Sequence, residues 1–539
     1  MQNAIKLDDV SLGPVRVVAQ RRPAPPPKLL KSWTHVAQLA KRPPRVLKSL
    51  RASGEYKSGN IERTTARWNT SHADANRALR WSLTTMRARS RTLERDDPYA
   101  KKFLGLCETN IIGPDGINVQ SRVEEIAPDG RVISDTAANR IIEREHYKFS
   151  AAGNYDATRR LSRAAFERLF IRTVARDGEV LVKKIADPQS RWGRRYQLLE
   201  ADWLDEGYNE DRPDGTRVIM GVELAPSGEA IAYHLHTRHP GDLAGTTRGE
   251  RVRYTADQIK LHFLPTRAGQ VRGVPWMHAA MSRLYQLGEF DESALIAARI
   301  GADKAMILED PEGMVADSVA DGALPDDNGN ENGPLYFNSQ KGSIDILPRG
   351  AKVAQFDPNY PSDAYGPFVL AALRGVSTGF GVEYHSLTGD LSQVNFSSIR
   401  AGTLQEHDMW KILQGWAIES LSQDLYADWL MTALLSPFKP LAYLPAGKFD
   451  KFNSPTFQAR RWDWVDPKKD LDAKILAIGA KLTSHRRVMA EQGIDLEDLL
   501  AEIQADKALA ASYGIDLDQL TPPTMQQPAT QPEPKDEVV

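Results

Sequence analysis

The sequence predicts a mixed α+β protein whose helices and strands occupy separate stretches of the chain. Several long stretches repeat apolar residues at three- and four-residue spacing, which is typical of amphipathic helices. Short alternating or β-branched stretches gather at about 179–265, where turn residues separate them, and these are typical of strands. The part over 61–270 is therefore predicted to be one mixed α+β unit, followed by long helices.

Length and composition favour a folded protein of several domains. At roughly 150 residues per domain, 539 residues correspond to about two to four domains, and 41% hydrophobic with 26% charged residues is ordinary for a soluble protein. No run of 18 or more apolar residues predicts a membrane span. The N-terminus lacks the layout of a signal peptide. Cys107 is the sole cysteine, so an intrachain disulfide and a multi-cysteine zinc site are excluded.

The net charge of −2 conceals two oppositely charged ends. Residues 1–100 hold 20 Lys and Arg against 8 Asp and Glu, whereas residues 465–539 hold 8 against 14. Residues 1–60 are also rich in proline, which favours an extended arm. A basic end can contact nucleic acid or an acidic partner, and it can equally be a solvated tail.

Helices are predicted on both sides of the strands. One amphipathic helix covers 73–97, a second begins at Asp97-Pro98 and stops near Gly113, and two more lie within 134–178. The predicted strands are 179–186, 196–204, 218–225, 230–236 and 258–265.

Long helices dominate the second half. The first spans 275–305 with Pro275 at its start, and its seam becomes rich in small residues: Ala280, Leu284, Leu287, Ala294, Ala298, Ala302 and Ala305. Loops dominate 309–345, and 343–358 resembles strands. Further helices are predicted at 364–381, at 398–435 before Pro437, and as two or three short ones within 470–513.

Enzyme chemistry has little support in the sequence. The motifs GxxxxGK[ST], GxSxG and HExxH are absent. Two clusters resemble metal ligands: His234, His236 and His239 near one strand end, and Glu200, Asp202, Asp205 and Glu206 after another strand. Paired carboxylates can hold Mg²⁺ for nuclease chemistry, but both clusters also fit polar, solvated strand ends.

Six stretches carry a resemblance to a known family. They are 90–121 (SRTLERDDPYAKKFLGLCETNIIGPDGINVQS), 198–206 (LLEADWLDE), 219–242, 263–281, 381–402 (GVEYHSLTGDLSQVNFSSIRAG) and 462–500. In this order, over about residues 60–500, the chain resembles lambda-type bacteriophage portal proteins.

The resemblance implies the portal fold, with a mixed α+β wing, a helical stem, a small clip and a mostly helical crown. The implied regions are a basic arm (1–60), wing (61–273), stem helix (274–306), clip region (307–360), second stem helix (361–382), channel loop (383–397), long wing helix with the following segment (398–464), crown (465–520) and disordered tail (521–539).

The resemblance also implies a non-enzymatic role without cofactor, metal or membrane. Such proteins form a homo-oligomeric ring, usually of twelve subunits, at one capsid vertex of the virion, after assembly in the host cytoplasm. The ring is the conduit for double-stranded DNA in packaging and ejection. It docks the terminase large subunit and head completion or connector proteins, and it contacts major capsid and scaffold proteins.

The channel loop is the predicted DNA site. Its residues are Asp390, Ser392, Gln393, Val394, Asn395 and Phe396, and 387–397 contains no Lys or Arg. A conduit must contact DNA without holding it, and phosphate contacts by Lys or Arg bind strongly. Asn395 or Ser397 can also cap the next helix. On the first stem helix, Glu289, Asp291 and Glu292 are predicted either to line the lumen or to lie on a solvated outer face.

Two alternatives remain. One is a metal-dependent phage nuclease or head-maturation enzyme that uses Glu200, Asp202 and Asp205. The other is a different structural connector protein, which would lack the long stem and wing helices.

Overall fold

The computed structural model describes ten stretches of the chain, which are residues 70–126, 128, 131–242, 250–302, 306–308, 344–346, 364–392, 395–462, 467–491 and 496–515. The chain divides into two compact units, Met1–His72 and Ala73–Val539, and all elements below belong to the second. Several predictions fall outside the described residues: the arm, most of the clip region, Gln393, Val394 and the C-terminal tail.

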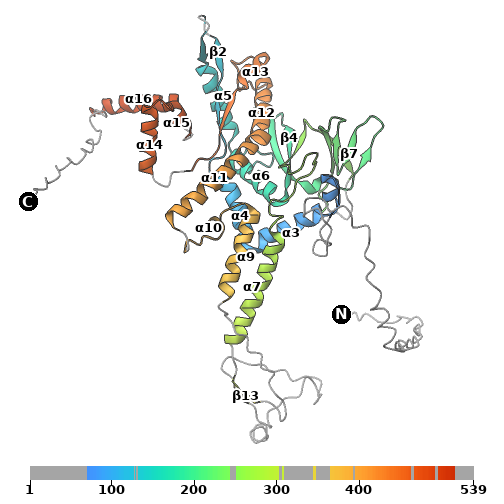
Figure 1. The fold of residues 1–539 in the computed structure, drawn as a ribbon. Helices are drawn as coiled ribbons and strands as arrows, with labels where there is room; N and C mark the ends of the chain where they lie inside the picture. Colours follow the sequence, from blue (N-terminus) through green and yellow to red (C-terminus); the bar gives the residue numbers. More distant parts are fainter. Residues whose placement is uncertain are drawn as a thin grey trace, which may run out of the picture. The chain divides into compact units, whose positions relative to one another are not determined.

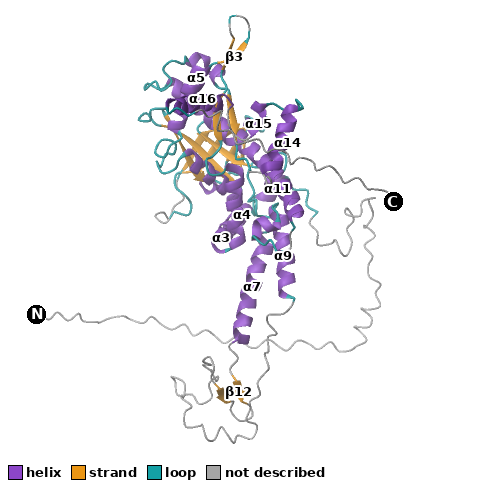
Figure 2. Cartoon of the chain, turned by 90° about the vertical axis from the view of Figure 1, so that its left-hand side faces the viewer, coloured by secondary structure: helices purple, strands orange, loops and turns teal. Residues whose placement is uncertain are grey.

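Helices and strands are segregated along the chain, which confirms the α+β prediction (Figure 2). The α-helices are α2 (Ala75–Leu79), α3 (Leu83–Asp96), α4 (Pro98–Cys107), α5 (Thr136–Phe149), α6 (Arg163–Asp177), α7 (Met281–Ala302), α9 (Tyr365–Phe380), α10 (Tyr384–Thr388), α11 (Phe396–Ala417), α12 (Gln423–Leu435), α13 (Phe449–Phe452), α14 (Pro467–Gly479), α15 (His485–Glu491) and α16 (Leu496–Ser512). Two π-helical turns, η2 (Glu108–Ile112) and η5 (Ile418–Ser422), continue α4 and α11, and η3 (Ala201–Trp203) and η6 (Ala446–Lys448) are 3₁₀ turns. Within these described parts, no helix is both long and apolar enough to cross a membrane.

The strands between α6 and α7 form two antiparallel sheets. One has the order β11-β4-β5, and the other has the order β10-β9-β8-β7-β6. Their bounds are β4 (Glu179–Ala186), β5 (Arg194–Glu200), β6 (Glu210–Asp211), β7 (Arg217–Ile219), β8 (Val222–Leu224), β9 (Ala230–His236), β10 (Arg251–Thr255) and β11 (Ile259–Phe263). Three two-stranded ribbons pair β1 (Asn118–Ser121) with β14 (Pro455–Gln458), β2 (Glu124–Ile126) with β3 (Val132–Ser134), and β12 (Met306–Leu308) with β13 (Ile344–Ile346).

One large hydrophobic core joins the helices to the sheet that contains β4 and β5. It includes Phe103 of α4, Phe170 of α6, Trp410 of α11 and Trp429 of α12, all almost fully buried. Phe380 at the end of α9 stacks on Phe103, with ring centroids 4.5 Å apart. The lower ends of α7 and α9 in Figure 1 run side by side away from this core. The core therefore fixes one end of the α7–α9 pair, where the candidate site lies.

The predicted strand 218–225 is instead a hairpin. Its two halves, β7 and β8, are joined by Met220 and Gly221, which have φ values of 47° and 82°. Two consecutive residues with positive φ form the tight turn that matches the twist of antiparallel strands. The sequence prediction missed this turn because methionine is rarely found with positive φ.

The long helix predicted from Pro275 begins later, at Met281. The preceding segment is tied to α6, because the backbone N–H of Trp276 donates to the Ala175 carbonyl at 3.0 Å. Gly273 packs directly on the Gly178 backbone, and a Cβ at Gly273 would collide with the Gly178 carbonyl. These contacts fix the chain around Pro275, and residues 276–280 form hydrogen-bonded turns before α7 begins.

Two other helix predictions need correction. The helix predicted over 73–97 breaks at residues 80–82 into α2 and α3. The helix predicted from Ser398 begins at Phe396, and the π-helical turn η5 interrupts it before α12. The predicted stops at Gly113 and Gly178 and the helix over 364–381 are confirmed, since Gly381 ends α9 with a φ of 73°.

The close contact between Gly273 and Gly178 predicts that a side chain at Gly273 will destabilise the protein. Gly273→Ala should lower the free energy of unfolding by about 1–3 kcal/mol, because the added methyl group forces the backbones apart. Gly288→Ala in α7 is the control, since nothing lies within 4 Å of its added Cβ, and it should be neutral or stabilising. Urea unfolding of both variants measures the difference. Equal midpoints would show that the junction is not tightly packed.

Candidate functional site

The candidate channel segment, residues 381–396, connects α9 to α11 and contains a helix that the sequence did not predict. α9 ends at Gly381, α10 follows, and Gly389 ends α10 with a φ of 76°. Glycine reaches positive φ without a steric penalty, so both helices end sharply. The predicted open loop is therefore a short helix followed by a turn.

Hydrogen bonds within the segment hold the turn after α10. The Oδ1 of Asp390 accepts hydrogen bonds from the backbone N–H of Ser392 at 2.9 Å and from its hydroxyl at 2.6 Å. The Tyr384 hydroxyl donates to Asp390 Oδ2 at 3.1 Å. The hydrogen bonds from Ser392 keep the pKa of Asp390 below its usual value, so this half-buried carboxylate is negative at neutral pH.

The second half of the segment leads into α11. The Asn395 side chain accepts a hydrogen bond from the backbone N–H of Ser398 at 2.8 Å, so the predicted helix cap at Asn395 is confirmed. Phe396 is the first residue of α11. Of the six predicted loop residues, the structure places Asp390 and Ser392 in the turn after α10, and Asn395 and Phe396 at the start of α11. Gln393 and Val394 lie outside the described residues.

Glu406 of α11 anchors the segment to the rest of the protein. Its carboxylate accepts hydrogen bonds from the Ser386 hydroxyl at 2.7 Å and from the indole Nε1 of Trp410 at 3.1 Å. Glu406 is 7% exposed and Leu387 of α10 is 2% exposed, so this face of α10 is packed down. The sequence analysis missed Glu406, since no local pattern links it to a serine twenty positions earlier.

A groove of about 480 Å³ lies beside the segment. Arg374 and Thr378 come from α9, Gln405 and Met409 from α11, and Tyr384 from α10. The Arg374 guanidinium lies 5.8 Å from the Tyr384 ring centroid, which keeps a positive charge at the edge of the groove.

The three predicted lumen residues of α7 have different surroundings. Glu289 and Glu292 are exposed. Asp291 is half-buried, and its Oδ1 accepts a hydrogen bond from the Tyr365 hydroxyl of α9 at 3.0 Å. Asp291 therefore joins the two helices, and only Glu289 and Glu292 present open carboxylates.

The predicted acidic cluster after β5 is divided by the fold. Glu200, Asp202 and His239 come together, with potential ligand atoms within 4.8 Å of one another. Asp205 turns away, because its Oδ2 accepts a hydrogen bond from Arg251 Nε at 2.9 Å. His234 instead contacts Glu223, with His234 Nε2 and Glu223 Oε2 2.9 Å apart. The three histidines therefore do not form one site.

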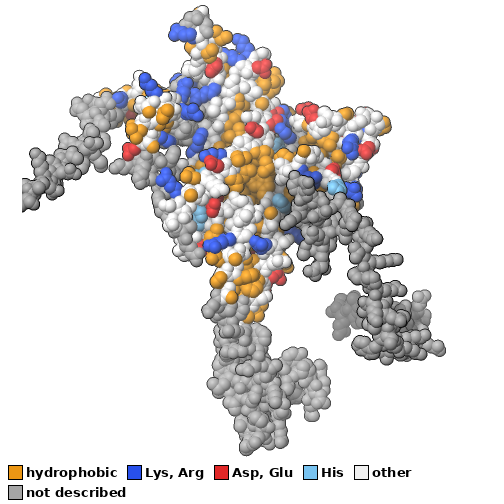
Figure 3. Space-filling view, viewed as in Figure 1, with side chains coloured by type: hydrophobic (Ala, Val, Ile, Leu, Met, Phe, Trp, Pro, Cys, Tyr) orange, Lys and Arg blue, Asp and Glu red, His pale blue; other side chains and the backbone are white. Residues whose placement is uncertain are grey.

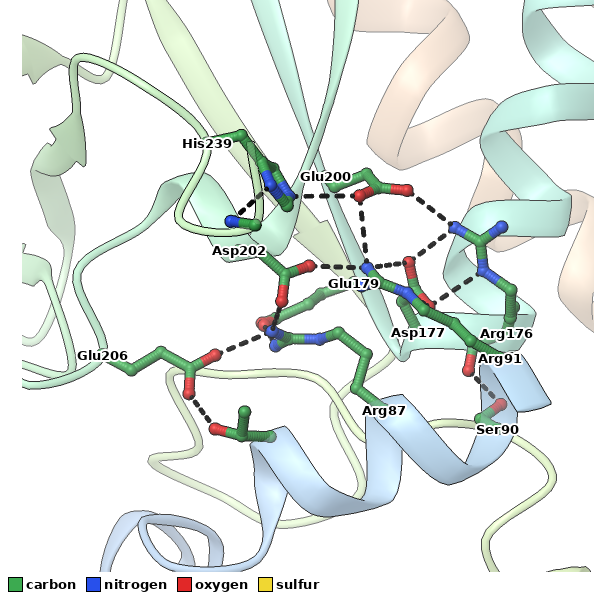
Figure 4. A network of polar contacts seen from close by, with 12 residues as sticks. Arg87, Ser90, Arg91, Arg176, Asp177, Glu179, Glu200, Asp202, Glu206 and His239 are labelled. Atoms are coloured by element: carbon green, nitrogen blue, oxygen red, sulfur yellow. Dashed lines mark hydrogen bonds and ion pairs between the residues drawn. The ribbon is translucent and has the colours of Figure 1, made fainter. Parts of the chain in front are cut away.

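Arginines form hydrogen bonds and ion pairs with the carboxylates of the remaining cluster, Glu200 and Asp202 (Figure 4). Asp202 accepts hydrogen bonds from Arg87 at 3.1 Å and from Arg91 at 2.5 Å, and Arg176 lies 3.4 Å from Glu200. Burial alone would raise the pKa of Asp202, but Arg87 and Arg91 outweigh it and lower the pKa. The ionised carboxylate of Asp202 therefore stabilises the folded protein at pH values above the ordinary carboxyl pKa. This contribution is lost as the pH falls through the lowered pKa of Asp202.

The histidine in this cluster also has the wrong tautomer for a metal ligand. The backbone N–H of Gly241 donates to His239 Nδ1 at 3.0 Å, so the neutral ring carries its proton on Nε2. That Nε2 faces Glu200 at 3.3 Å. Since Nε2 has no free lone pair in this arrangement, the cluster fits an ion-pair network better than a metal site.

A family model and the sequences of known relatives identify the same family for this chain. The model of the lambda family of phage portal proteins matches residues 62–414, which include the whole candidate channel segment. A probable portal protein of Halomonas phage phiHAP-1 is 34% identical over 471 residues, covering 87% of this chain and 88% of that protein. Portal protein B of Escherichia phage lambda is 21% identical, covering 81% and 85%. A chain from the neck of a native gene transfer agent particle, computed with C12 symmetry, matches with a TM-score of 0.36 at 13% identity, covering 75% of this chain and 93% of that chain.

The anchor at Glu406 predicts a local effect on the segment. Glu406→Ala should speed amide hydrogen exchange in residues 383–392 by roughly tenfold, because α10 loses its hydrogen-bond acceptor on α11. Gln405→Ala changes an exposed neighbour and is the control. Exchange measured by mass spectrometry decides the question, and equal protection in the two variants would contradict the anchoring role.

The ion-pair network makes a second prediction. Asp202→Asn should destabilise the protein by about 1–3 kcal/mol, since it removes a charged acceptor from Arg87 and Arg91. Millimolar Mg²⁺, Mn²⁺ or Zn²⁺ should leave the unfolding midpoint of the natural protein unchanged, and linear DNA should stay intact with Mg²⁺. A metal-dependent rise in stability that Asp202→Asn abolishes would restore the nuclease alternative.

Proposed function

Because this chain belongs to the lambda family of phage portal proteins, we propose that its copies close a ring through which double-stranded DNA enters and leaves the capsid. The family is structural rather than enzymatic, and its members are virion components at a capsid vertex. The proposal adds to this that the ring has about twelve copies and that the candidate channel segment faces the DNA.

The charge of the candidate channel segment is the observation that carries the proposal. Residues 387–397 contain no Lys or Arg, while Asp390 holds a negative charge among neutral hydrogen-bonding groups. Each phosphate neutralised by a cation adds affinity that depends on salt, so a cationic rim would hold the duplex. A rim with one carboxylate per copy repels phosphate weakly and lets DNA slide.

The mechanical support of the segment fits the same role. Glycines end α9 and α10, and Glu406 fixes α10 to α11. Leu391 at the turn is 59% exposed. A projecting turn on a fixed base can contact a passing duplex while its position relative to α11 is kept.

The remaining assignments are part of the proposal. The α7–α9 pair serves as the stem, the sheets as part of the wing, and α14, α15 and α16 as the crown. The terminase large subunit, head completion or connector proteins, major capsid protein and scaffold are the proposed partners, with assembly in the host cytoplasm. Of the three carboxylates predicted for the lumen wall of the stem or for its solvated outer face, Glu289 and Glu292 are exposed, whereas Asp291 accepts a hydrogen bond from Tyr365.

The alternative functions have less support. The nuclease would need Glu200, Asp202 and Asp205 in one open cluster, whereas Asp205 bonds Arg251 and arginines occupy Asp202. A short connector protein would lack helices as long as α7 and α11, which have 22 residues each.

Deletion of residues 390–396 tests the channel role. Rings should still assemble, because the core lies elsewhere, but DNA packaging or retention should fall. Replacing the same residues with glycine and serine, at equal length, is the control that keeps the chain connection. Particles are scored for ring assembly by electron microscopy and for genome content by nuclease protection.

Two results would contradict the proposal. If rings with the deletion package and retain full-length DNA normally, the segment does not meet DNA. If the natural protein incorporates into virions without forming a closed ring with a central hole, the conduit itself is wrong.

A further inference from the structure

One side of α7 has no partner in the described part of the chain. Tyr285, Glu289, Glu292 and Ile296 recur at spacings of four, three and four, so they form one stripe along the helix. All four are exposed, with Tyr285 61% exposed. A stripe that combines large apolar groups with carboxylates, on a helix whose other side is packed, is a surface that a partner can cover.

This stripe points away from α9. Contacts with α9 are made by Ala280, which directly precedes α7, and by Arg283, Phe290 and Asp291 of α7. Their partners are Gly379, Gly375, Phe368 and Tyr365 respectively. At 3.6 residues per turn, the exposed stripe lies roughly 180° around the α7 axis from these contacts. The outer face of α7 is therefore open on the side opposite to α9.

α9 has a complementary flank. Gly375 and Gly379 face α7, since a Cβ at Gly375 would collide with the Arg283 guanidinium and one at Gly379 would lie 2.9 Å from Ala280 Cβ. Arg374 lies roughly 100–140° around the α9 axis from these glycines, so it points mostly away from α7. Arg374 is exposed and borders the groove of about 480 Å³.

The two faces also lie at the same level along the antiparallel pair. Arg283 meets Gly375 and Phe290 meets Phe368, so Tyr285 lies level with the turn that holds Arg374. In a ring whose axis runs parallel to α7 and α9, each residue keeps its height from copy to copy. A neighbouring copy in such a ring would present its Arg374 flank at the level of Tyr285.

We propose that Tyr285 and Glu289 of this stripe dock on the α9 flank of the next copy, with Tyr285 entering the groove beside Arg374 and Glu289 pairing with Arg374, and that Glu292 lies beyond the contact. This inference rests on the proposed ring and names the surface that closes it. The contact joins two different faces on opposite sides of one chain, and such head-to-tail contacts generate rings when the rotation closes.

Side-chain direction supports this pairing. Helix side chains lean toward the N-terminus of their own helix. Because the helices are antiparallel, Tyr285 leans toward the level of Thr378, where the groove lies, while Arg374 leans toward the level of Glu289. Glu292 lies one turn further along, at about 4.5 Å of additional rise, and is out of line with Arg374.

The proposal places Glu289 between copies, whereas the sequence left it either on the lumen wall or on a solvated outer face. Opposite charges that meet across an interface steer association and exclude wrong partners. The aromatic ring of Tyr285 would supply buried area at small entropic loss, as tyrosine does at interfaces generally.

A charge exchange tests the pairing. Glu289→Arg and Arg374→Glu should each raise the concentration needed for ring formation by at least about fivefold, the effect expected from losing one such pair. The double variant should restore assembly. Glu292→Arg, about one turn beyond the proposed contact on the same helix, is the matched control and should assemble like the natural protein. Mass by light scattering and ring counts by electron microscopy give the readout.

Tyr285→Ala tests the groove separately. It should also weaken assembly, whereas Leu295→Ala, which removes a side chain that is 68% exposed roughly 80° around the same helix, should not. Circular dichroism confirms that each variant is folded. Normal assembly of Tyr285→Ala would overturn the groove contact.

A cross-link avoids reliance on assembly defects. Cys107 is buried and is the sole cysteine, so a pair of introduced cysteines can be joined selectively. Glu289→Cys with Arg374→Cys should give a ladder of covalent oligomers with a short bis-maleimide, and Glu292→Cys with Arg374→Cys should give much less. Equal ladders, or no rescue by the charge exchange while natural rings form, would overturn this surface and leave the ring intact. Failure of the natural protein to form rings in particles would instead overturn the proposed function.

Discussion

The carboxylate of Glu179 is the constraint on which the arrangement of the helices depends. It is fully buried at the start of β4, directly after α6. It accepts hydrogen bonds from Arg272 Nη2 at 2.5 Å, from Arg87 Nη2 at 2.8 Å and from the backbone N–H of Gly273 at 2.8 Å. A buried carboxylate is tolerated only when its lone pairs are matched in this way. One side chain thereby fixes α3, β4 and the chain that leads into α7.

The position of the candidate channel segment depends on these contacts of Glu179. Gly273 and Gly178 pack backbone against backbone, which sets where α7 leaves the core. α9 returns beside α7 through Gly375 and Gly379, and Phe380 stacks on Phe103 as α9 re-enters the core. The segment begins at the next residue. The small residues and the buried ion pairs of Glu179 therefore determine where the turn of Asp390 lies. The described hydrogen bonds of the turn itself are local.

The sequence was sufficient for features that local chemistry determines. Gly178 and Gly381 end helices because each takes a positive φ, and Asn395 caps α11 through its own side chain. The predicted strand over 230–236 matches β9. The family resemblance rested on ordered stretches of this kind, and the comparisons confirm it.

Features that depend on distant residues were not predictable. Helix α7 begins six residues after Pro275 because α6 holds the preceding chain, and α10 forms because Glu406 and the core receive it. The sequence pattern around Asp202 resembled a metal site, but in the structure Asp202 bonds Arg87 and Arg91, which lie more than a hundred positions earlier in the chain. Asp291 was predicted on the lumen wall of the stem or on its outer face, and its hydrogen bond with Tyr365 depends on the packing of α9 against α7.

The most direct test of the account is a photo-cross-link from the candidate channel segment to DNA. A photoreactive amino acid at Leu391, the exposed residue of the turn, is activated in particles that hold DNA in the portal vertex, and the same amino acid at Tyr443, which is 85% exposed on a different segment, is the control. The account predicts DNA adducts from position 391 and none from position 443. Adducts from position 443 without any from position 391 would show that DNA does not pass this segment.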